Sequence, residues 1–205
     1  MVHASELMRY ERELMAQGCR YICGVDEVGR GPLAGPVTCA AVIMPLDDLI
    51  DGVNDSKKVA KKKRERLAEL IKEKAVAYSV ASYDNRKIDE MNILAATKAC
   101  MAEAVAGLAV TPDVVIVDAL TLDIPIRTFG IVHGDAQSYS IAAASILAKV
   151  ERDAYMTGMD EVYPGYGFSS NAGYGTAAHI AALKELGPTP IHRRTFIGHF
   201  VDADE

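Results

Sequence analysis

The apolar segment 21–25 ends at two adjacent carboxylates, Asp26 and Glu27, and a Gly29-Arg30-Gly31 turn follows almost at once. The apolar run predicts a buried strand, and the glycines predict a loop. Carboxylate oxygens bind hard divalent cations, and glycine lets a phosphate or a sugar approach the main chain closely. This stretch therefore favours a metal-dependent phosphodiester site. A strand that ends in a solvated acidic turn is the alternative.

The size and composition of the chain are those of a single globular domain. The chain has 205 residues, half of them apolar and about a quarter charged, which is enough to bury a sizeable core. No apolar run reaches the length needed to span a membrane. Residues 1–15 carry three glutamates among their apolar residues, so we expect an amphipathic helix there rather than a signal peptide. We expect residues 1–205 to form one domain.

The four cysteines show neither a paired CxxC pattern nor a disulfide framework. Cys23 and Cys39 lie in strand candidates, so we expect buried free thiols. Free thiols are typical of a reducing compartment, and the cytoplasm is therefore the expected location.

The net charge of −6 argues against nucleic acid as a partner, because nucleic-acid binders are usually basic. The distribution of charge argues the other way. Seven lysines and arginines fall within residues 57–66, Arg193 and Arg194 form a second basic point, and acids gather in the tail 202–205. Bound divalent cations would also reverse the sign of an acidic cleft. A solvated helix face is the alternative for the lysine run.

The hydrophobic pattern alternates between strand and helix periods. We expect helices at residues 4–17, 59–74, 85–108, 137–157 and 176–186, and strands at 20–26, 36–44, 75–83, 114–117 and 124–132. Residues 163–175 are rich in glycine, serine and tyrosine and predict a loop. Intermixed strands and helices favour an α/β fold with a mixed central sheet.

Two further aspartates fall where such a fold places chemistry. Asp118 ends the apolar run 114–117, and Asp135 precedes a predicted helix. Open α/β sheets bind ligands beyond the carboxyl ends of their strands. Asp118 could instead close a turn, and Asp135 could instead cap the helix. Acids packed this closely repel one another and raise one another's pKa, so the arrangement favours bound cations.

Ten segments, in this order, carry a resemblance to a known family: residues 24–37, 54–58, 88–93, 117–119, 134–136, 140–150, 152–153, 163–168, 173–176 and 192–194. The chain closely resembles bacterial ribonuclease HII over nearly its whole length. The resemblance implies a ribonuclease H-like mixed sheet flanked by helices, with a helical C-terminal part at about residues 160–205. It also implies that the chain lacks the extra N-terminal domain of ribonuclease HIII.

The resemblance implies an endonuclease that hydrolyses the RNA strand of RNA–DNA hybrids and cuts 5′ of single ribonucleotides in duplex DNA. The implied chemistry uses two Mg²⁺ or Mn²⁺ ions and leaves a 5′-phosphate and a 3′-hydroxyl. The implied roles are ribonucleotide removal from DNA and RNA primer removal. We expect a monomer with nucleic-acid partners and no membrane partner.

The resemblance also assigns site residues. The metal-binding catalytic acids are Asp26, Glu27, Asp118 and Asp135. The substrate contacts are Gly29, Arg30 and Gly31 at the ribose 2′-hydroxyl, Tyr174 on a sugar, and Lys57 on a phosphate. A loop that senses the 2′-hydroxyl agrees with the chemistry, because this hydroxyl is the group that distinguishes RNA from DNA.

The chain departs from the family at two positions. His133 and Ala172 stand where a lysine is common, and both changes remove positive charge near the substrate. Three rival interpretations stay open: another metal nuclease of the same fold, a non-catalytic hybrid-binding module, and a nucleotide-binding protein that uses the glycine loop. The histidines His179, His192 and His199 have no carboxylate at metal spacing, so we expect surface or structural roles for them.

Overall fold

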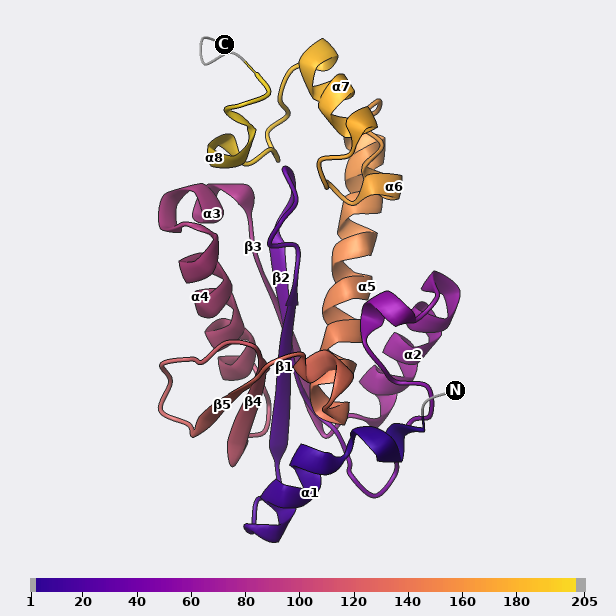
Figure 1. The fold of residues 1–205 in the computed structure, drawn as a ribbon, viewed down its shortest axis with the longest axis vertical. Helices are drawn as coiled ribbons and strands as arrows, with labels where there is room; N and C mark the ends of the chain where they lie inside the picture. Colours follow the sequence, from indigo (N-terminus) through magenta and orange to yellow (C-terminus); the bar gives the residue numbers. More distant parts are fainter. Residues whose placement is uncertain (1–2, 202–205) are drawn as a thin grey trace.

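The computed structural model describes residues 3–201, which form one mixed five-stranded sheet with helices on both faces (Figure 1). The strands are β1 (Ile22–Val28), β2 (Val37–Ile43), β3 (Ala77–Tyr83), β4 (Val114–Asp118) and β5 (Thr128–Ile131), in the spatial order β3-β2-β1-β4-β5. The central strand β1 pairs antiparallel with β2 and parallel with β4. The predicted α/β fold with a mixed central sheet is therefore confirmed.

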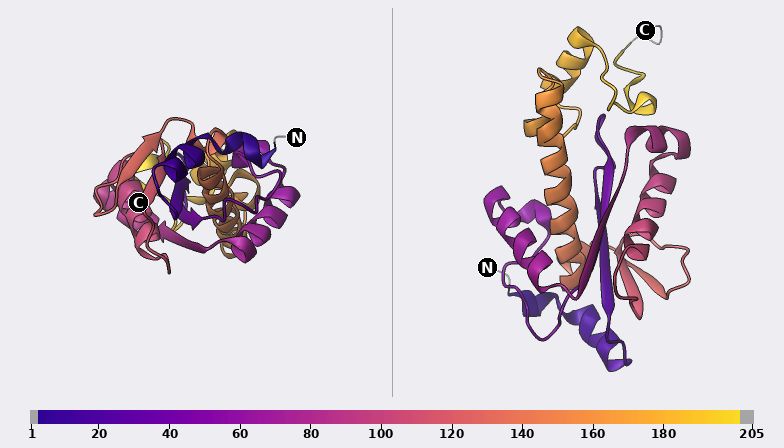
Figure 2. Two further views of the ribbon diagram at one scale, coloured as in Figure 1. Left: turned by 90° about the horizontal axis from the view of Figure 1, so that it is seen from below. Right: turned by 180° about the vertical axis from the view of Figure 1, so that it is seen from behind.

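Helices form a layer on each side of the sheet (Figures 1 and 2). The long helix α5 (Tyr139–Val162) packs along β1 and β2, and α2 (Lys61–Lys74) packs against α5. On the other face lie α3 (Asn85–Met91) and α4 (Ile93–Ala106). Successive side chains of β1 point to opposite faces of the sheet, so alternate residues of β1 face the two helical layers.

Glycine at position 24 allows α5 to approach the sheet closely. A Cβ atom on Gly24 would lie 2.1 Å from the main-chain carbon of Ser140 in α5, so any larger residue would displace the helix. Gly24 stands two residues before Asp26 and shares its face of the sheet. The close contact therefore fixes α5 beside the acidic end of β1.

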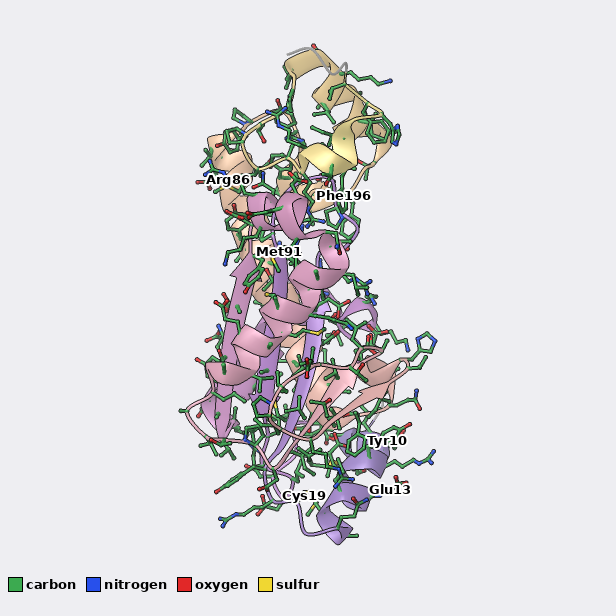
Figure 3. All side chains as sticks on the ribbon, turned by 90° about the vertical axis from the view of Figure 1, so that its left-hand side faces the viewer. Tyr10, Glu13, Cys19, Arg86, Met91 and Phe196 are labelled. Carbon is green, nitrogen blue, oxygen red and sulfur yellow. The ribbon has the colours of Figure 1, made fainter. Side chains whose placement is uncertain are left out.

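The two ends of the molecule are built from short helices. Beyond the sheet, α6 (Phe168–Asn171) and α7 (Ala177–Leu186) lie at the far end of α5, whereas α8 (Arg194–Ile197) lies over α3 (Figure 1). Figure 3 labels Phe196 of α8 and Met91 of α3, and these two helices are in contact. Asp89 of α3 accepts hydrogen bonds from the main-chain N–H groups of Arg194 and Thr195, at 2.8 and 3.0 Å. These bonds join α8 to α3.

The opposite end carries η1 (Ala4–Leu7) and α1 (Arg9–Ala16), where Figure 3 marks Tyr10 and Glu13. The prediction of one continuous helix over residues 4–17 is therefore wrong, because the helical segment is interrupted at Met8.

The expected helix 85–108 is also divided. Asn92 adopts a positive φ of 69°, and its side chain accepts hydrogen bonds from the N–H groups of Leu94 and Ala95. An asparagine in this role ends one helix and caps the next. The expected loop 163–175 contains α6, and α8 was not predicted.

In the described part of the chain the four cysteines are free, as predicted. No helix among residues 3–201 is long and apolar enough to cross a membrane. The acidic tail 202–205 lies outside the described residues.

Candidate active site

Asp26 and Asp118 come from neighbouring parallel strands and face the same layer. The register of β1 and β4 pairs Val25 with Val117, so the two aspartates follow side by side. Ile22 of β1 and Ile116 of β4 lie in one buried cluster with Ile141 of α5. Because Asp26 and Asp118 share the parity of those isoleucines, they also start from the α5 face.

The structure corrects one detail of the prediction. Asp26 and Glu27 do not end the first strand, because β1 runs on to Val28 through its pairing with Thr38 of β2. Asp118 does end β4, as expected. β1 therefore continues past its acids, whereas β4 ends at Asp118. Asp26 and Glu27 both lie at positions that still pair with β2.

Asp26 is nearly inaccessible, with 4% of its surface exposed. Burial raises the pKa of Asp26 well above its usual range, and the neighbouring charges of Glu27 and Asp118 raise it further. A hydrogen bond from Ser145 of α5 and one from the N–H of Glu27, at 2.8 Å, partly offset these effects. A buried carboxylate surrounded by other acids is stable as an anion only if a cation compensates it.

Glu27 starts from the opposite face of β1 to Asp26. Its Oε1 lies 3.5 Å from Arg30 Nη1, and its buried Oε2 has no hydrogen-bond partner within the described residues. Burial raises the pKa of Glu27, Arg30 lowers it, and the charge of Asp118 raises it. A buried carboxylate oxygen without a partner is costly unless a further ligand pairs with it.

Asp135 lies in η3 (Gly134–Ala136) and does not cap α5. Ser138 is the N-cap of that helix, and its side chain accepts the N–H of Ile141. The capping alternative for Asp135 is therefore wrong. The N–H of Gly134 donates to Asp118 Oδ1 at 2.7 Å, which ties η3 to the end of β4.

The pKa of Asp135 is raised by burial and by the nearby charges of Asp55 and Asp118, and Lys57 opposes this. Lys57 is exposed, in η2 (Ser56–Lys58), and its Nζ lies 3.8 Å from Asp135 Oδ2. Partial burial lowers the pKa of Lys57, but the charges of Asp135, Asp55 and Asp26 outweigh it and raise the pKa overall. Lys57 is therefore a cation that faces the acidic cluster.

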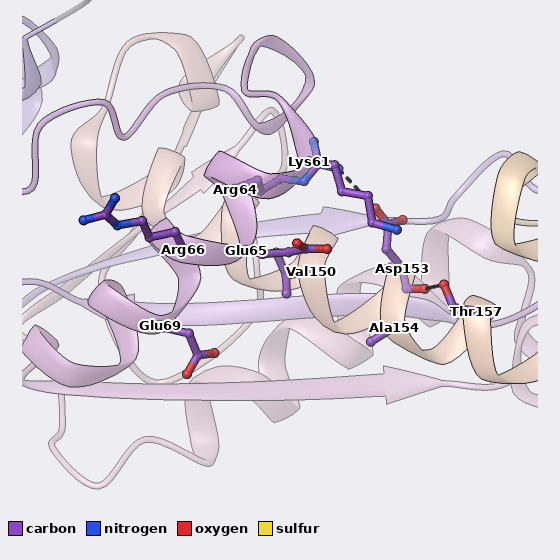
Figure 4. Close-up of a pocket in the computed structure, with 9 residues that line it drawn as sticks. All are labelled: Lys61, Arg64, Glu65, Arg66, Glu69, Val150, Asp153, Ala154 and Thr157. Atoms are coloured by element: carbon purple, nitrogen blue, oxygen red, sulfur yellow. Dashed lines mark hydrogen bonds and ion pairs between the residues drawn. The ribbon is translucent and has the colours of Figure 1, made fainter.

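A groove of about 640 Å³ lies between α2 and α5, and Figure 4 shows the residues that line it. Arg64 reaches across its end and donates to the carbonyl oxygens of Ser56 and Val59, at 2.8 and 2.9 Å. It also pairs with Asp153 of α5 at 3.2 Å. Arg64 therefore fixes η2, and with it the main chain of Lys57, against α5. The groove itself adds no carboxylate to the acidic cluster.

The acids fit divalent cations in chemistry but do not form a complete cage. Among residues 3–201, no group of three His, Cys, Asp or Glu side chains is arranged to hold a metal ion. Asp26 and Glu27 start on opposite faces of β1. Cations bound through oxygen would nevertheless pair with the buried, unpartnered Glu27 Oε2. They would also offset the repulsion among Asp26, Glu27 and Asp118.

The Gly29-Arg30-Gly31 turn is held by Arg193, which the sequence had suggested to be a basic surface point. Arg193 is fully buried. Its guanidinium donates to the carbonyl oxygens of Gly29, Arg30 and Gly35, at 2.5 to 3.0 Å. Burial lowers the pKa of Arg193 to about 9, and the charge of Arg152 contributes. These hydrogen bonds occupy carbonyl oxygens of the turn. The N–H groups of the turn are its main-chain donors, and Arg193 does not engage them.

A second buried guanidinium, Arg152 of α5, supports the same loop. It donates to the carbonyl oxygens of Pro36, Ala34 and Ala172, at 2.8, 3.2 and 2.9 Å. The helical period offered a signal for it, since Arg152 is four residues from the buried residues Ala148 and Met156. No local signal could have found Arg193, because its partners are some 160 positions earlier in the chain.

Tyr174 lies beside this turn, and 43% of its surface is exposed. A Cβ atom on Gly31 would lie 3.7 Å from Tyr174 Cε1, so the ring faces the turn. The two positions that lack the family's lysines are both left-handed, with φ of 55° at His133 and 50° at Ala172. The structure therefore brings Tyr174 to Gly31, and Lys57 to the acids.

The fold defines a class of protein. Residues 23–199 match the family model of ribonuclease HII. A ribonuclease H2 from Pyrococcus horikoshii OT3 superposes with a TM-score of 0.71 and 27% identity, over 86% of this chain and 93% of that one. A ribonuclease HII from Archaeoglobus fulgidus, solved in complex with PCNA, gives 0.71 and 29%, over 85% and 93%. The chain therefore has the ribonuclease H-like fold.

A ribonuclease HII of Shouchella clausii (strain KSM-K16) is 54% identical over 93% of this chain and 74% of its own length. One from Enterococcus faecalis (strain ATCC 700802 / V583) is 53% identical over 93% and 75%. The chain belongs to the ribonuclease HII family, and it is an enzyme of the ribonuclease H type.

Proposed function

We propose that this chain is an endonuclease that hydrolyses the RNA strand of RNA–DNA hybrids and cuts 5′ of single ribonucleotides in duplex DNA. The observation that carries the proposal is the pairing of two chemistries at one end of β1. Asp26 and Asp118 lie side by side there. A glycine turn clamped by Arg193 follows within a few residues of Asp26, and among residues 3–201 the N–H groups of Gly29, Arg30 and Gly31 donate to no main-chain carbonyl. Acids suit phosphodiester hydrolysis, and the turn suits a 2′-hydroxyl.

Asp26, Glu27, Asp118 and Asp135 would hold two divalent cations, Mg²⁺ or Mn²⁺. When bound, the two ions supply an activated water and stabilise the charge on the leaving 3′-oxygen. Cleavage then leaves a 5′-phosphate and a 3′-hydroxyl. The protein's own contribution is electrostatic, because buried acids concentrate negative charge where cations are needed.

The remaining residues would position the substrate. Lys57 would contact a phosphate next to the acids, and Gly29, Arg30 and Gly31 would read the ribose 2′-hydroxyl. Tyr174 would stack on the sugar at the RNA–DNA junction. The ring's exposure and its closeness to Gly31 support this role. Arg193 and Arg152 would act indirectly, as positioning residues that keep the turn in shape.

The cellular roles that follow are ribonucleotide removal from DNA and RNA primer removal. We propose that residues 1–205 work as one catalytic unit, as a monomer, with its helical C-terminal part from about residue 160. The free thiols support a reducing location such as the cytoplasm. Nucleic acid is the proposed partner.

The proposal is tested with three end-labelled duplexes of one sequence: RNA–DNA, RNA–RNA and DNA–DNA. We expect cleavage of the RNA strand in the hybrid alone, in Mg²⁺ or Mn²⁺ and not in chelator. The product ends are then mapped by ligation and phosphatase treatment, and a 3′-phosphate would contradict the proposed mechanism. Binding of the hybrid without cleavage would favour a non-catalytic binding module.

A further inference from the structure

Two buried histidines lie outside the acidic cluster. His179 of α7 and His192, which precedes α8, have no exposed surface. Their Nε2 atoms are 3.1 Å apart. The rings of Tyr166 and Phe168 pack around both of them. The pair therefore has a structural setting and no surface role.

The hydrogen bonds fix where each proton sits. The main-chain N–H and the hydroxyl of Thr189 lie 2.9 and 2.8 Å from His192 Nδ1, and because the N–H can only donate, this nitrogen is an acceptor. The proton of neutral His192 is then on Nε2, and it donates to His179 Nε2. The proton of neutral His179 is in turn on Nδ1, and it donates to the carbonyl oxygen of Tyr174 at 2.9 Å. The chain of bonds runs in one direction, from Thr189 to Tyr174.

Both rings must be neutral for this arrangement, since two protonated Nε2 atoms would face each other. Burial lowers the pKa of His179, and burial and the charge of His179 lower the pKa of His192 to about 4. The relay is therefore complete at neutral pH.

The relay ends on the residue whose ring faces the glycine turn. The Tyr174 carbonyl also accepts the N–H of Thr176 at 2.8 Å, and the Tyr174 N–H donates to Asn171. The preceding residue, Gly173, accepts the N–H of Leu33 at 2.8 Å. The main chain at Tyr174 is thus held from α7 on one side and from the loop after the glycine turn on the other.

We infer that His192 and His179 form a positioning relay for Tyr174. The relay sets the position of the Tyr174 ring relative to Gly31 and so strengthens binding of the substrate's sugar. This inference rests on the proposed function, because that function gives Tyr174 its sugar. The two histidines are positioning residues and touch no reacting atom.

The first test does not depend on activity. In ¹⁵N NMR of the imidazoles of the unmodified protein, we expect His192 in the Nε2–H form, His179 in the less common Nδ1–H form, and a scalar coupling between the two Nε2 atoms. Nε2–H protons on both rings, or two imidazoliums near neutral pH, would overturn the relay.

The second test separates positioning from packing. His179→Leu removes the donor to Tyr174, whereas His179→Asn keeps an N–H at nearly the place of Nδ1. On a duplex with one ribonucleotide, we expect His179→Leu to raise KM about tenfold with kcat little changed, and His179→Asn to restore most of the loss. In a Tyr174→Ala background the same His179→Leu change should cost almost nothing.

An equal penalty with and without the Tyr174 ring would overturn the inference, because a packing role would not pass through that ring. If the unmodified protein leaves every duplex intact, the proposed function fails, while the NMR result still decides whether the relay exists. The two failures are therefore distinguishable.

Discussion

Arg193 Nη2 lies 2.5 Å from the carbonyl oxygen of Gly29, although the two residues are 164 positions apart along the chain. A buried guanidinium near the C-terminus therefore shapes the turn that follows the first strand. The proposed recognition of ribose depends on this long-range contact as much as on the turn's own glycines.

Replacing Arg193 should damage both the turn and the grip on substrate. Arg193→Lys leaves buried carbonyl oxygens without donors, and each costs about 1–3 kcal/mol. We expect a loss of unfolding free energy on the order of 3 kcal/mol, measured by urea denaturation. KM for a hybrid should rise. Arg194→Lys is the matched control, because that side chain is exposed and its main-chain bonds to Asp89 remain. Equal effects of the two substitutions would contradict the clamp.

The two glycines of the turn should respond differently to alanine. At Gly29, φ is +93° and a Cβ would lie 2.2 Å from Arg152 Nε, so Gly29→Ala should cost at least about 1–3 kcal/mol. At Gly31 the nearest atom would be Tyr174 Cε1 at 3.7 Å, and Gly31→Ala should leave the thermal midpoint nearly unchanged. Thermal unfolding of both variants measures the contrast. A stable Gly29→Ala protein would show that the turn is not built as described.

Asp26→Asn should stabilise the metal-free protein and abolish its cleavage activity. The substitution removes a buried charge that Glu27 and Asp118 repel, while it keeps the shape of the side chain. Asp113→Asn is the opposite control, since the N–H groups of Arg20 and Tyr21 bond to that carboxylate and lower its pKa. Melting curves in chelator should therefore shift up for Asp26→Asn and down for Asp113→Asn. A lower melting temperature for Asp26→Asn would count against the electrostatic account.

The pH dependence of stability should change sign when cations are added. Burial raises the folded-state pKa values of Asp26, Glu27 and Asp135, so between their usual and raised values the folded state binds more protons than the unfolded chain. This contribution to stability is full below the usual carboxyl range and is lost as pH rises through the raised pKa values. Cations need the deprotonated acids, so their stabilisation should grow with pH.

The measurement is the melting temperature in chelator and in millimolar Mn²⁺, from about pH 5 to about pH 8. Asp26→Asn should flatten both trends. A Mn²⁺ effect that is constant over this range would mean that the ions do not bind at these acids.

The sequence predicted the strands well and the ends of elements less well. The β-branched run that leads to Asp118 has a strong local signal, and β4 ends at Asp118, one residue after that run. How far β1 runs is decided by its pairing with β2, which no local pattern contains. The helix period likewise runs through Asn92, and only its side-chain cap and positive φ divide the helix there.

The candidate site divides in the same way. Asp26, Glu27 and Asp118 could be proposed because each lies at or near the end of an apolar run, and Asp135 because it precedes a predicted helix. The burial of Arg193 and the bond between His179 and His192 could not, because their partners are brought together only by the fold. Charged and titratable residues are usually exposed, so these residues look like surface residues until their partners are known.

The most direct test of the account is cleavage of a DNA duplex that carries one ribonucleotide, with Mg²⁺ or Mn²⁺, beside an all-DNA duplex and the Asp118→Asn variant. We predict a single cut on the 5′ side of the ribonucleotide, lost in chelator and slowed on the order of a thousandfold or more in the variant. Cutting of the all-DNA duplex, or an Asp118→Asn enzyme of unchanged rate, would contradict the central claim. That claim is that the acidic cluster supports hydrolysis of the phosphodiester 5′ of a ribonucleotide, which the glycine turn recognises.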